Sequence, residues 1–196
     1  MEIVDLVYLR LLQEFNGVSY GNRQLTVDYI YNHRSVDVAV GDWILLYASK
    51  EEANWLGIGA QNILKTVTVV VDVRTNNKEA YGKIKQKIQQ NFTQQIFYRF
   101  VEGTATDITV NVVSSSTIGT YLDKVTVNDS SPYSVNEYVQ YGDEKGWIVW
   151  INGNDLYVFK RKGVYFSFRP KSIVDLSDKM KLLYRFTLEI EGYAIQ

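Results

Sequence analysis

The segment from Lys65 to Asn91 constrains the fold of this chain more than any other. Its first part alternates valines with mostly polar residues, and alternate side chains of a strand share one face. The valines of that face are Val67, Val69, Val71 and Val73. Asn76 and Glu79 then form a capping-box pattern, which predicts a helix start. Apolar residues follow at helical spacing, at Tyr81, Ile84 and Ile88. The segment therefore predicts a strand with one buried face followed by an amphipathic helix.

Composition limits the classes of protein that this chain can represent. It has 196 residues, enough for one large or two small domains, and 46% of them are hydrophobic, enough for a real core. The formal net charge of −1 gives no basic field that would favour nucleic acid. The absence of cysteine excludes disulfides, thiolate catalysis and cysteine zinc sites. No apolar run reaches the roughly 18 residues of a membrane helix, and the acidic start lacks the basic region of a signal peptide.

The two ends of the chain predict further parts of the same sheet. A helical apolar stripe predicts a helix over residues 3–15, ended by Asn16-Gly17. Residues 25–31 and 43–48 read as strands, and residues 49–62 as an exposed loop. Residues 180–195 alternate apolar and polar side chains, which predicts a long, half-buried strand. Arg185 and Glu189 lie on the polar face of that strand. They are a cross-strand match for Arg74 and Asp72, so we expect the last strand to join the sheet of residues 25–74.

The middle of the chain has a different sequence pattern. Short strand-like segments alternate with turn residues from residue 102 onward, at the spacing of a small all-β module. The clearest hairpin turns at Asn152-Gly153, and a brief helical pattern appears only at residues 172–177. We therefore predict an α+β fold in which an antiparallel or mixed sheet packs with two helices. Residues 1–101 and 171–196 would form this core, and residues 102–170 an inserted all-β module, SH3-like or a sandwich.

Residues with catalytic or metal-binding chemistry are sparse. His33 is the only histidine and lies in a polar turn, where a surface histidine is the simpler interpretation. Acidic pairs, which can hold magnesium or act in acid–base chemistry, also lie in loop-like contexts. These pairs are Asp37 and Asp42, Glu51 and Glu52, and Asp143 and Glu144. Burial in a strand could adjust the acid–base properties of Asp72, although a salt bridge with Arg74 or Arg185 is the favoured interpretation. We predict no catalytic residue, no cofactor and no metal site.

Two basic segments raise the alternative of nucleic-acid binding. Lys160, Arg161 and Lys162 follow the predicted hairpin beside several aromatic residues, and the helix after Asn76 carries four lysines. Basic residues interleaved with aromatic ones can bind single-stranded nucleic acid. A solvated helix face and a charged turn that protects an edge strand are the simpler interpretation, given the acidic balance of the chain.

Trp147 and Trp150 are candidates for a contact surface. They are separated by an odd number of residues, so on a regular strand they point to opposite faces. A core on one face of the sheet cannot bury both. One tryptophan is therefore exposed, moved by a bulge, or covered by a partner.

Two motifs in the core carry a resemblance to a known family. The strand ending Val71-Asp72-Val73-Arg74-Thr75, with the polar helix after it, is one motif, and the late strand from Tyr184 to Ile190 is the other. Together they resemble the tail terminator or tail-completion proteins of long-tailed, siphovirus-like viruses, over residues 1–100 and 180–196. The segment from Gly146 to Ile151 is similar to SH3-like β-barrels.

The resemblance implies a structural protein of the virion rather than an enzyme. Its members are small α+β proteins that form a hexameric ring at the head-proximal end of the tail, where they stop tube polymerisation and join the head. Strand 66–74, helix 77–90 and strand 182–191 would build the ring. The implied partners are further copies of the chain, the tail tube protein and head–tail connector proteins, assembled in the host cytoplasm. The insertion 102–170 departs from the family pattern and would decorate the ring or contact its partners.

Two other classes of function remain open from the residues alone. One is a nucleic-acid-binding module that uses the basic and aromatic hairpin of the insertion. The other is an enzyme, for example a hydrolase with an Asp or Glu, for which the sequence offers no motif.

Overall fold

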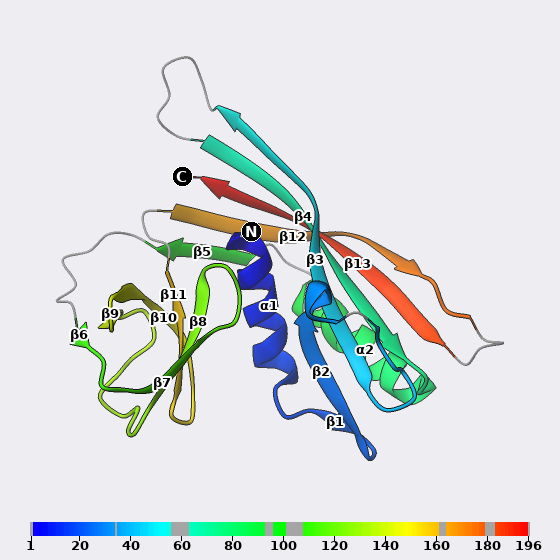
Figure 1. Cartoon of the computed structure of the whole chain (residues 1–196). Helices are drawn as coiled ribbons and strands as arrows, with labels where there is room; N and C mark the ends of the chain where they lie inside the picture. The colour runs from blue at the N-terminus through cyan, green and yellow to red at the C-terminus, as the bar shows by residue number, and fades with distance from the viewer. Residues whose placement is uncertain are drawn as a thin grey trace.

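The computed structural model describes residues 2–33, 35–55, 63–92, 96–100, 108–160, 164–178 and 183–195. The described helices are α1 (Glu2–Phe15), α2 (Lys78–Asn91) and a short 3-10 helix, η1 (Ile30–Asn32). A seven-stranded sheet contains β1 (Ser19–Tyr20), β2 (Arg23–Tyr29), β3 (Asp42–Trp55), β4 (Ile63–Thr75), β5 (Ile96–Phe100), β12 (Val164–Asp175) and β13 (Tyr184–Ile195). A six-stranded sheet contains β6 (Ile108–Thr109), β7 (Val112–Thr117), β8 (Leu122–Val127), β9 (Tyr138–Tyr141), β10 (Glu144–Asn152) and β11 (Asp155–Phe159). The predicted α+β class, with two α-helices and mixed sheets, is confirmed (Figure 1).

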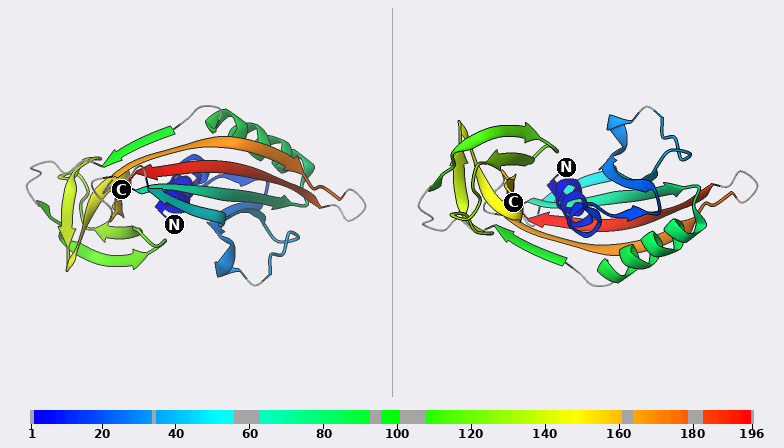
Figure 2. Two further views of the ribbon diagram at one scale, coloured as in Figure 1. Left: turned by 90° about the horizontal axis from the view of Figure 1, so that it is seen from above. Right: turned by 90° about the horizontal axis from the view of Figure 1, so that it is seen from below.

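β4 lies at the centre of the seven-stranded sheet, whose strand order is β1-β2-β3-β4-β13-β12-β5. The four valines of its predicted inner face are at most 1% exposed and pack in one cluster with α1 and α2. β13 pairs antiparallel with β4 along its whole length, as the charges on its polar face predicted. Figure 2 shows β3, β4, β13 and β12 side by side as a long, twisted ribbon. This ribbon is the scaffold on which the other elements are placed.

α1 lies between the two sheets (Figure 1). It contacts β2, β3, β4, β12 and β13, and its buried residues share a cluster with Leu122, Tyr157 and Phe159 of the six-stranded sheet. Asp5 is 2% exposed and accepts hydrogen bonds from the Tyr29 hydroxyl and the Tyr121 backbone N–H, both at 2.7 Å. Burial raises the pKa of this carboxyl above its usual value. The helix therefore joins the sheets and is more widely buried than a one-sided amphipathic helix.

The six-stranded sheet buries residues on both of its faces. One face packs toward α1, and the other encloses a separate cluster that includes Val125, Val139, Ile148 and Leu156. The last residue of the chain that belongs to this sheet is Phe159, at the end of β11. Residues 164–170, which were predicted to belong to the insertion, lie in β12 of the seven-stranded sheet.

Three local predictions are wrong at specific residues. Residues 49–55 continue β3, and residues 56–62 of the predicted loop lie outside the described residues. Residues 172–175 continue β12 as a strand, where a short helix was predicted. The helix cap is Asn77 and not Asn76, since the Asn77 side chain accepts hydrogen bonds from the N–H groups of Glu79 and Ala80. The cause of the last shift is Thr75, whose hydroxyl accepts the Asn77 N–H and places that residue at the helix entrance.

Candidate functional site

Asp72 holds two arginines on the face of the sheet opposite the helices. Arg74 donates two hydrogen bonds to Oδ2 of Asp72, at 3.0 and 2.7 Å, and Arg185 donates one to each oxygen, at 2.8 Å. The carboxylate is 1% exposed, and the hydrogen bond from Arg185 raises the pKa of that guanidinium above its usual value. The predicted salt bridges of Asp72 with Arg74 and Arg185 are confirmed. Because four N–H donors occupy this carboxylate, it is a structural clamp and a poor general base.

Glu189 does not take part in this clamp. In the strand register Arg74 lies opposite Arg185, whereas Glu189 lies opposite Val70. Glu189 lies four positions along β13 from Arg185, which places their Cα atoms about 13 Å apart. Glu189 instead accepts a hydrogen bond from Ser172 at 3.2 Å. The predicted match of Glu189 with Arg74 is therefore wrong for reasons of register.

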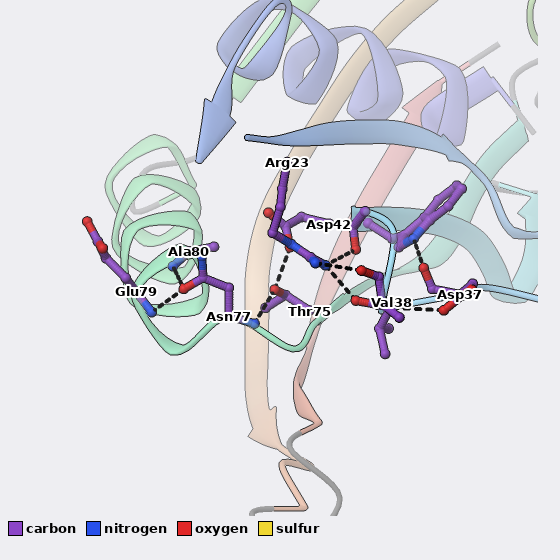
Figure 3. A network of polar contacts seen from close by, with 11 residues as sticks. Arg23, Asp37, Val38, Asp42, Thr75, Asn77, Glu79 and Ala80 are labelled. Carbon is purple, nitrogen blue, oxygen red and sulfur yellow. Dashed lines mark hydrogen bonds and ion pairs between the residues drawn. The ribbon is translucent and has the colours of Figure 1, made fainter. Parts of the chain in front are cut away.

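A second buried carboxylate, Asp42, anchors the entrance to β3 (Figure 3). It is fully buried, accepts a hydrogen bond from Arg23 at 3.1 Å and accepts another from the Thr75 hydroxyl. Arg23 also donates to three carbonyls of the preceding loop, those of Val38, Ala39 and Gly41. Asp42, which was predicted to lie in a loop-like context, is therefore a buried residue at the start of β3. Through Thr75 and Asn77 the network ties β2, β3 and β4 to the start of α2.

Trp147 and Trp150 lie on the same face of the six-stranded sheet. β10 contains a bulge, because Ile148 pairs with Val158 while Trp150 pairs with Tyr157. The extra residue returns Trp150 to the side of Trp147, and both pack, partly buried, against the main core cluster. Of the three predicted outcomes, the bulge is the one observed. These tryptophans help to dock the six-stranded sheet onto α1.

The described basic side chains are largely engaged within the fold. Lys160 forms an ion pair with Asp123 at 3.2 Å, while Arg161 and Lys162 lie outside the described residues. On α2, Lys83 pairs with Glu79, and Lys87 donates to the backbone carbonyl of Glu14. No observation at these residues favours nucleic-acid binding.

Catalytic and metal-binding groups do not gather in the described part of the chain. His33 lies 2.9 Å from Asp28 and edge-on to the ring of Trp43. Within the described ranges, no group of three or more His, Cys, Asp or Glu side chains is placed to hold a metal ion. None of the described helices is long and apolar enough to cross a membrane.

The seven-stranded sheet is staggered, so that each side has a stretch of strand without an outer neighbour. β2 pairs with β3 only as far as Leu46. On the other side, β5 pairs with β12 only between Val164 and Phe168. In the described residues, no strand pairs with the outer side of β3 after Leu46 or of β12 after Phe168. We name residues 47–53 the β3 edge and residues 169–176 the β12 edge.

The two edges carry opposite charge. The exposed charged residues of the β3 edge are Lys50, Glu51 and Glu52, and those of the β12 edge are Arg169, Lys171 and Asp175. By formal charge the β3 edge has one more acid than base, and the β12 edge one more base than acid. Lys50 already pairs with Glu52 at 2.7 Å, and Arg169 with Glu191 at 2.9 Å. Each edge also has a bulge, at Ala48/Lys50 in β3 and at Pro170/Ser172 in β12. Bulges, charges and proline discourage the addition of a strand, so contacts at these edges are expected to run through side chains.

Apolar groups accompany the charges at both edges. Ile173, Val174 and Leu176 are 38–46% exposed at the β12 edge, beside a cavity of about 200 Å³. That cavity is lined by Gln89, Phe92, Pro170, Ile173 and Leu188. Next to the β3 edge, Tyr31 is 67% exposed and its ring stacks on Tyr29. A cavity of about 180 Å³ opens there, lined by Val4, Asp5, Tyr29, Tyr31, Tyr47, Ala48 and Thr120.

The staggered edges are the candidate site that sequence reasoning missed. The charges of residues 50–52 were visible, but they were assigned to a loop. Only the strand pairing shows that they lie on the side of the sheet opposite Arg169 and Lys171.

The chain matches no protein-family model, and no curated protein matches it.

Proposed function

We propose that this chain is a structural protein of a virion, a tail terminator that assembles as a hexameric ring. The ring caps the tail tube at its head-proximal end and joins it to the head–tail connector. The observation that carries the proposal is the opposite charge of the β3 and β12 edges. Two unlike surfaces on opposite sides of one sheet suit a heterologous, head-to-tail contact, which forms a ring when its rotation closes.

Charges and apolar groups have different tasks in such a contact. Exposed ion pairs contribute only about 0–1 kcal/mol each, so the charges mainly orient the approaching copy. Burial of Ile173, Val174 and Leu176 against the tyrosine-lined side of the next copy supplies the larger favourable term.

The six-stranded sheet is the second part of the proposal. Its own buried cluster and its docking on α1 support an inserted all-β module, SH3-like or sandwich-like, that sits beside the ring. In this position it offers a surface to the connector or to the tube protein. The Asp72 clamp and the Arg23 network keep the ring-forming strands in place.

Charge reversal tests the contact. Glu52→Lys and Lys171→Glu should each reduce the assembled fraction at moderate salt by tenfold or more, because each places like charges across the contact. The double variant should recover most of the assembly. Asp143→Lys, a similar change in an exposed turn of the other sheet, should leave it unchanged. Analytical ultracentrifugation gives the fractions, and equal loss in the double variant and both single variants would contradict the proposal.

Tube assembly tests the function itself. Added to a polymerising tail tube protein of the same virus, the protein should cap one end of each tube and stop its growth. Electron microscopy shows the caps and the tube lengths. Tubes of unchanged length without a bound ring would exclude the terminator function even if rings form alone.

A further inference from the structure

β7 is an open strand at the border of the six-stranded sheet. Among the described strands it pairs with β8 alone, and all six of its residues, Val112 to Thr117, are exposed. Val112 and Val113 are 39% and 57% exposed, although valine side chains favour burial. The outer backbone groups of this strand can therefore pair with another strand.

β7 carries less protection against strand addition than the β3 edge and the β12 edge. No residue between Ile108 and Leu122 is charged, and none is proline. The β3 edge combines a bulge with three charges, and the β12 edge combines a bulge with Pro170 and Lys171. β6, at the other end of the strand order, has only two residues and is joined to β7 through Val110 and Asn111. Since β7 has a bulge at Val113 but neither charge nor proline, it is better suited to strand addition than β6, the β3 edge or the β12 edge.

We propose that β7 pairs antiparallel with β7 of a second copy of this chain, so that the two six-stranded sheets become continuous. When a strand pairs with the same strand of a second copy around a two-fold axis, like charges lie opposite one another and repel. β7 has no charge, so this cost is absent. The cross-strand partners become valine, serine and threonine, which pair well across antiparallel strands.

This contact is distinct from the ring contact. It is isologous, uses the other sheet, and neither requires nor excludes the proposed function. Since only a few residues meet, the pairing is expected to be weak and dependent on concentration. In an assembled ring it would link two rings, or link a ring to another assembly of this chain.

Sedimentation velocity over a hundredfold range of concentration tests the pairing, in the Glu52→Lys background so that ring contacts do not interfere. We expect a monomer–dimer equilibrium that Ser115→Lys weakens at least tenfold, since it places two lysines near the two-fold axis. Ser134→Lys, at an exposed serine in a turn of the same module, should leave the equilibrium unchanged. A monomer at every concentration, or a dimer indifferent to Ser115→Lys, would overturn the proposal.

Cross-linking provides a second readout, because the chain contains no cysteine. With a short bismaleimide, Ser115→Cys should give a covalent dimer and Ser134→Cys should not. Equal dimer yields from the two variants would also count against pairing through β7. Circular dichroism of each variant checks that the exposed substitutions leave the fold intact.

Discussion

At the scale of residues, the fold depends on two buried carboxylates, of which Asp72 holds two arginines and Asp42 holds one. Asp72 and Asp42 are at most 1% exposed, and each lies where strands distant in sequence meet. Burial of a charge is costly unless hydrogen bonds compensate it. Arg74 and Arg185 together bond both oxygens of Asp72. Arg23 and Thr75 both bond Oδ1 of Asp42, whose Oδ2 has no hydrogen-bond partner among the described residues. These carboxylates therefore specify which strands lie next to each other.

The Asp72→Ala variant tests this role. Removal of the Asp72 carboxylate leaves Arg74 and Arg185 side by side without their counter-ion. The side chains of these arginines are 25% and 32% exposed. We expect the free energy of unfolding in urea to fall by about 3 kcal/mol, as for other broken buried pairs. Glu189→Ala, on the same face of the sheet, should cost less than about 1 kcal/mol. Similar losses in the two variants would show that Asp72 is no special anchor.

Sequence reasoning found Asp72 and its arginines but missed Asp42. Strand alternation places Asp72, Arg74 and Arg185 on one face, and opposite charges on one face tend to pair. Asp42 follows a glycine in a polar loop, and its burial depends on Arg23, 19 residues earlier in the chain. A contact of this kind has no periodic pattern in the sequence.

At the scale of elements, prediction succeeded where one face of a strand or helix is buried. β4 and β13 alternate clearly because their inner faces pack on the helices. The outer part of β3 is exposed on both faces, so it shows no alternation and was read as a loop. The sequence predicts a bulge in β10 as one of three outcomes but does not select it, because the tryptophans themselves fit either face.

The start of α2 offers a test at the same scale. Asn77→Ala should lower the free energy of unfolding by about 1 kcal/mol, because the Asn77 side chain accepts two N–H groups that would otherwise lack a partner. Asn76→Ala, one residue earlier, should have little effect. Thermal or urea denaturation of both variants measures this difference. A larger loss of unfolding free energy in Asn76→Ala than in Asn77→Ala would contradict Asn77 as the cap and support the capping box that the sequence pattern predicted.

At the scale of the whole molecule, the arrangement of two sheets around α1 could not be read from the sequence. Apolar periodicity identifies the buried stripe of α1, but not that a second sheet, more than a hundred residues later, closes over Asp5 through Tyr121. Gly119 makes this approach possible, since a Cβ there would collide with the Asp5 carboxylate and the Tyr29 hydroxyl. The stagger of the large sheet, and with it the opposite edges, likewise follows only from strand register.

Cross-linking between the β3 and β12 edges tests the central proposal most directly. A chain with both Glu52→Cys and Lys171→Cys, treated with a flexible bismaleimide, should give a ladder of covalent oligomers that ends at six copies. Either cysteine alone should give no ladder, because a head-to-tail contact joins unlike edges. No species above the monomer with both cysteines, or equal cross-linking with one cysteine alone, would contradict the ring.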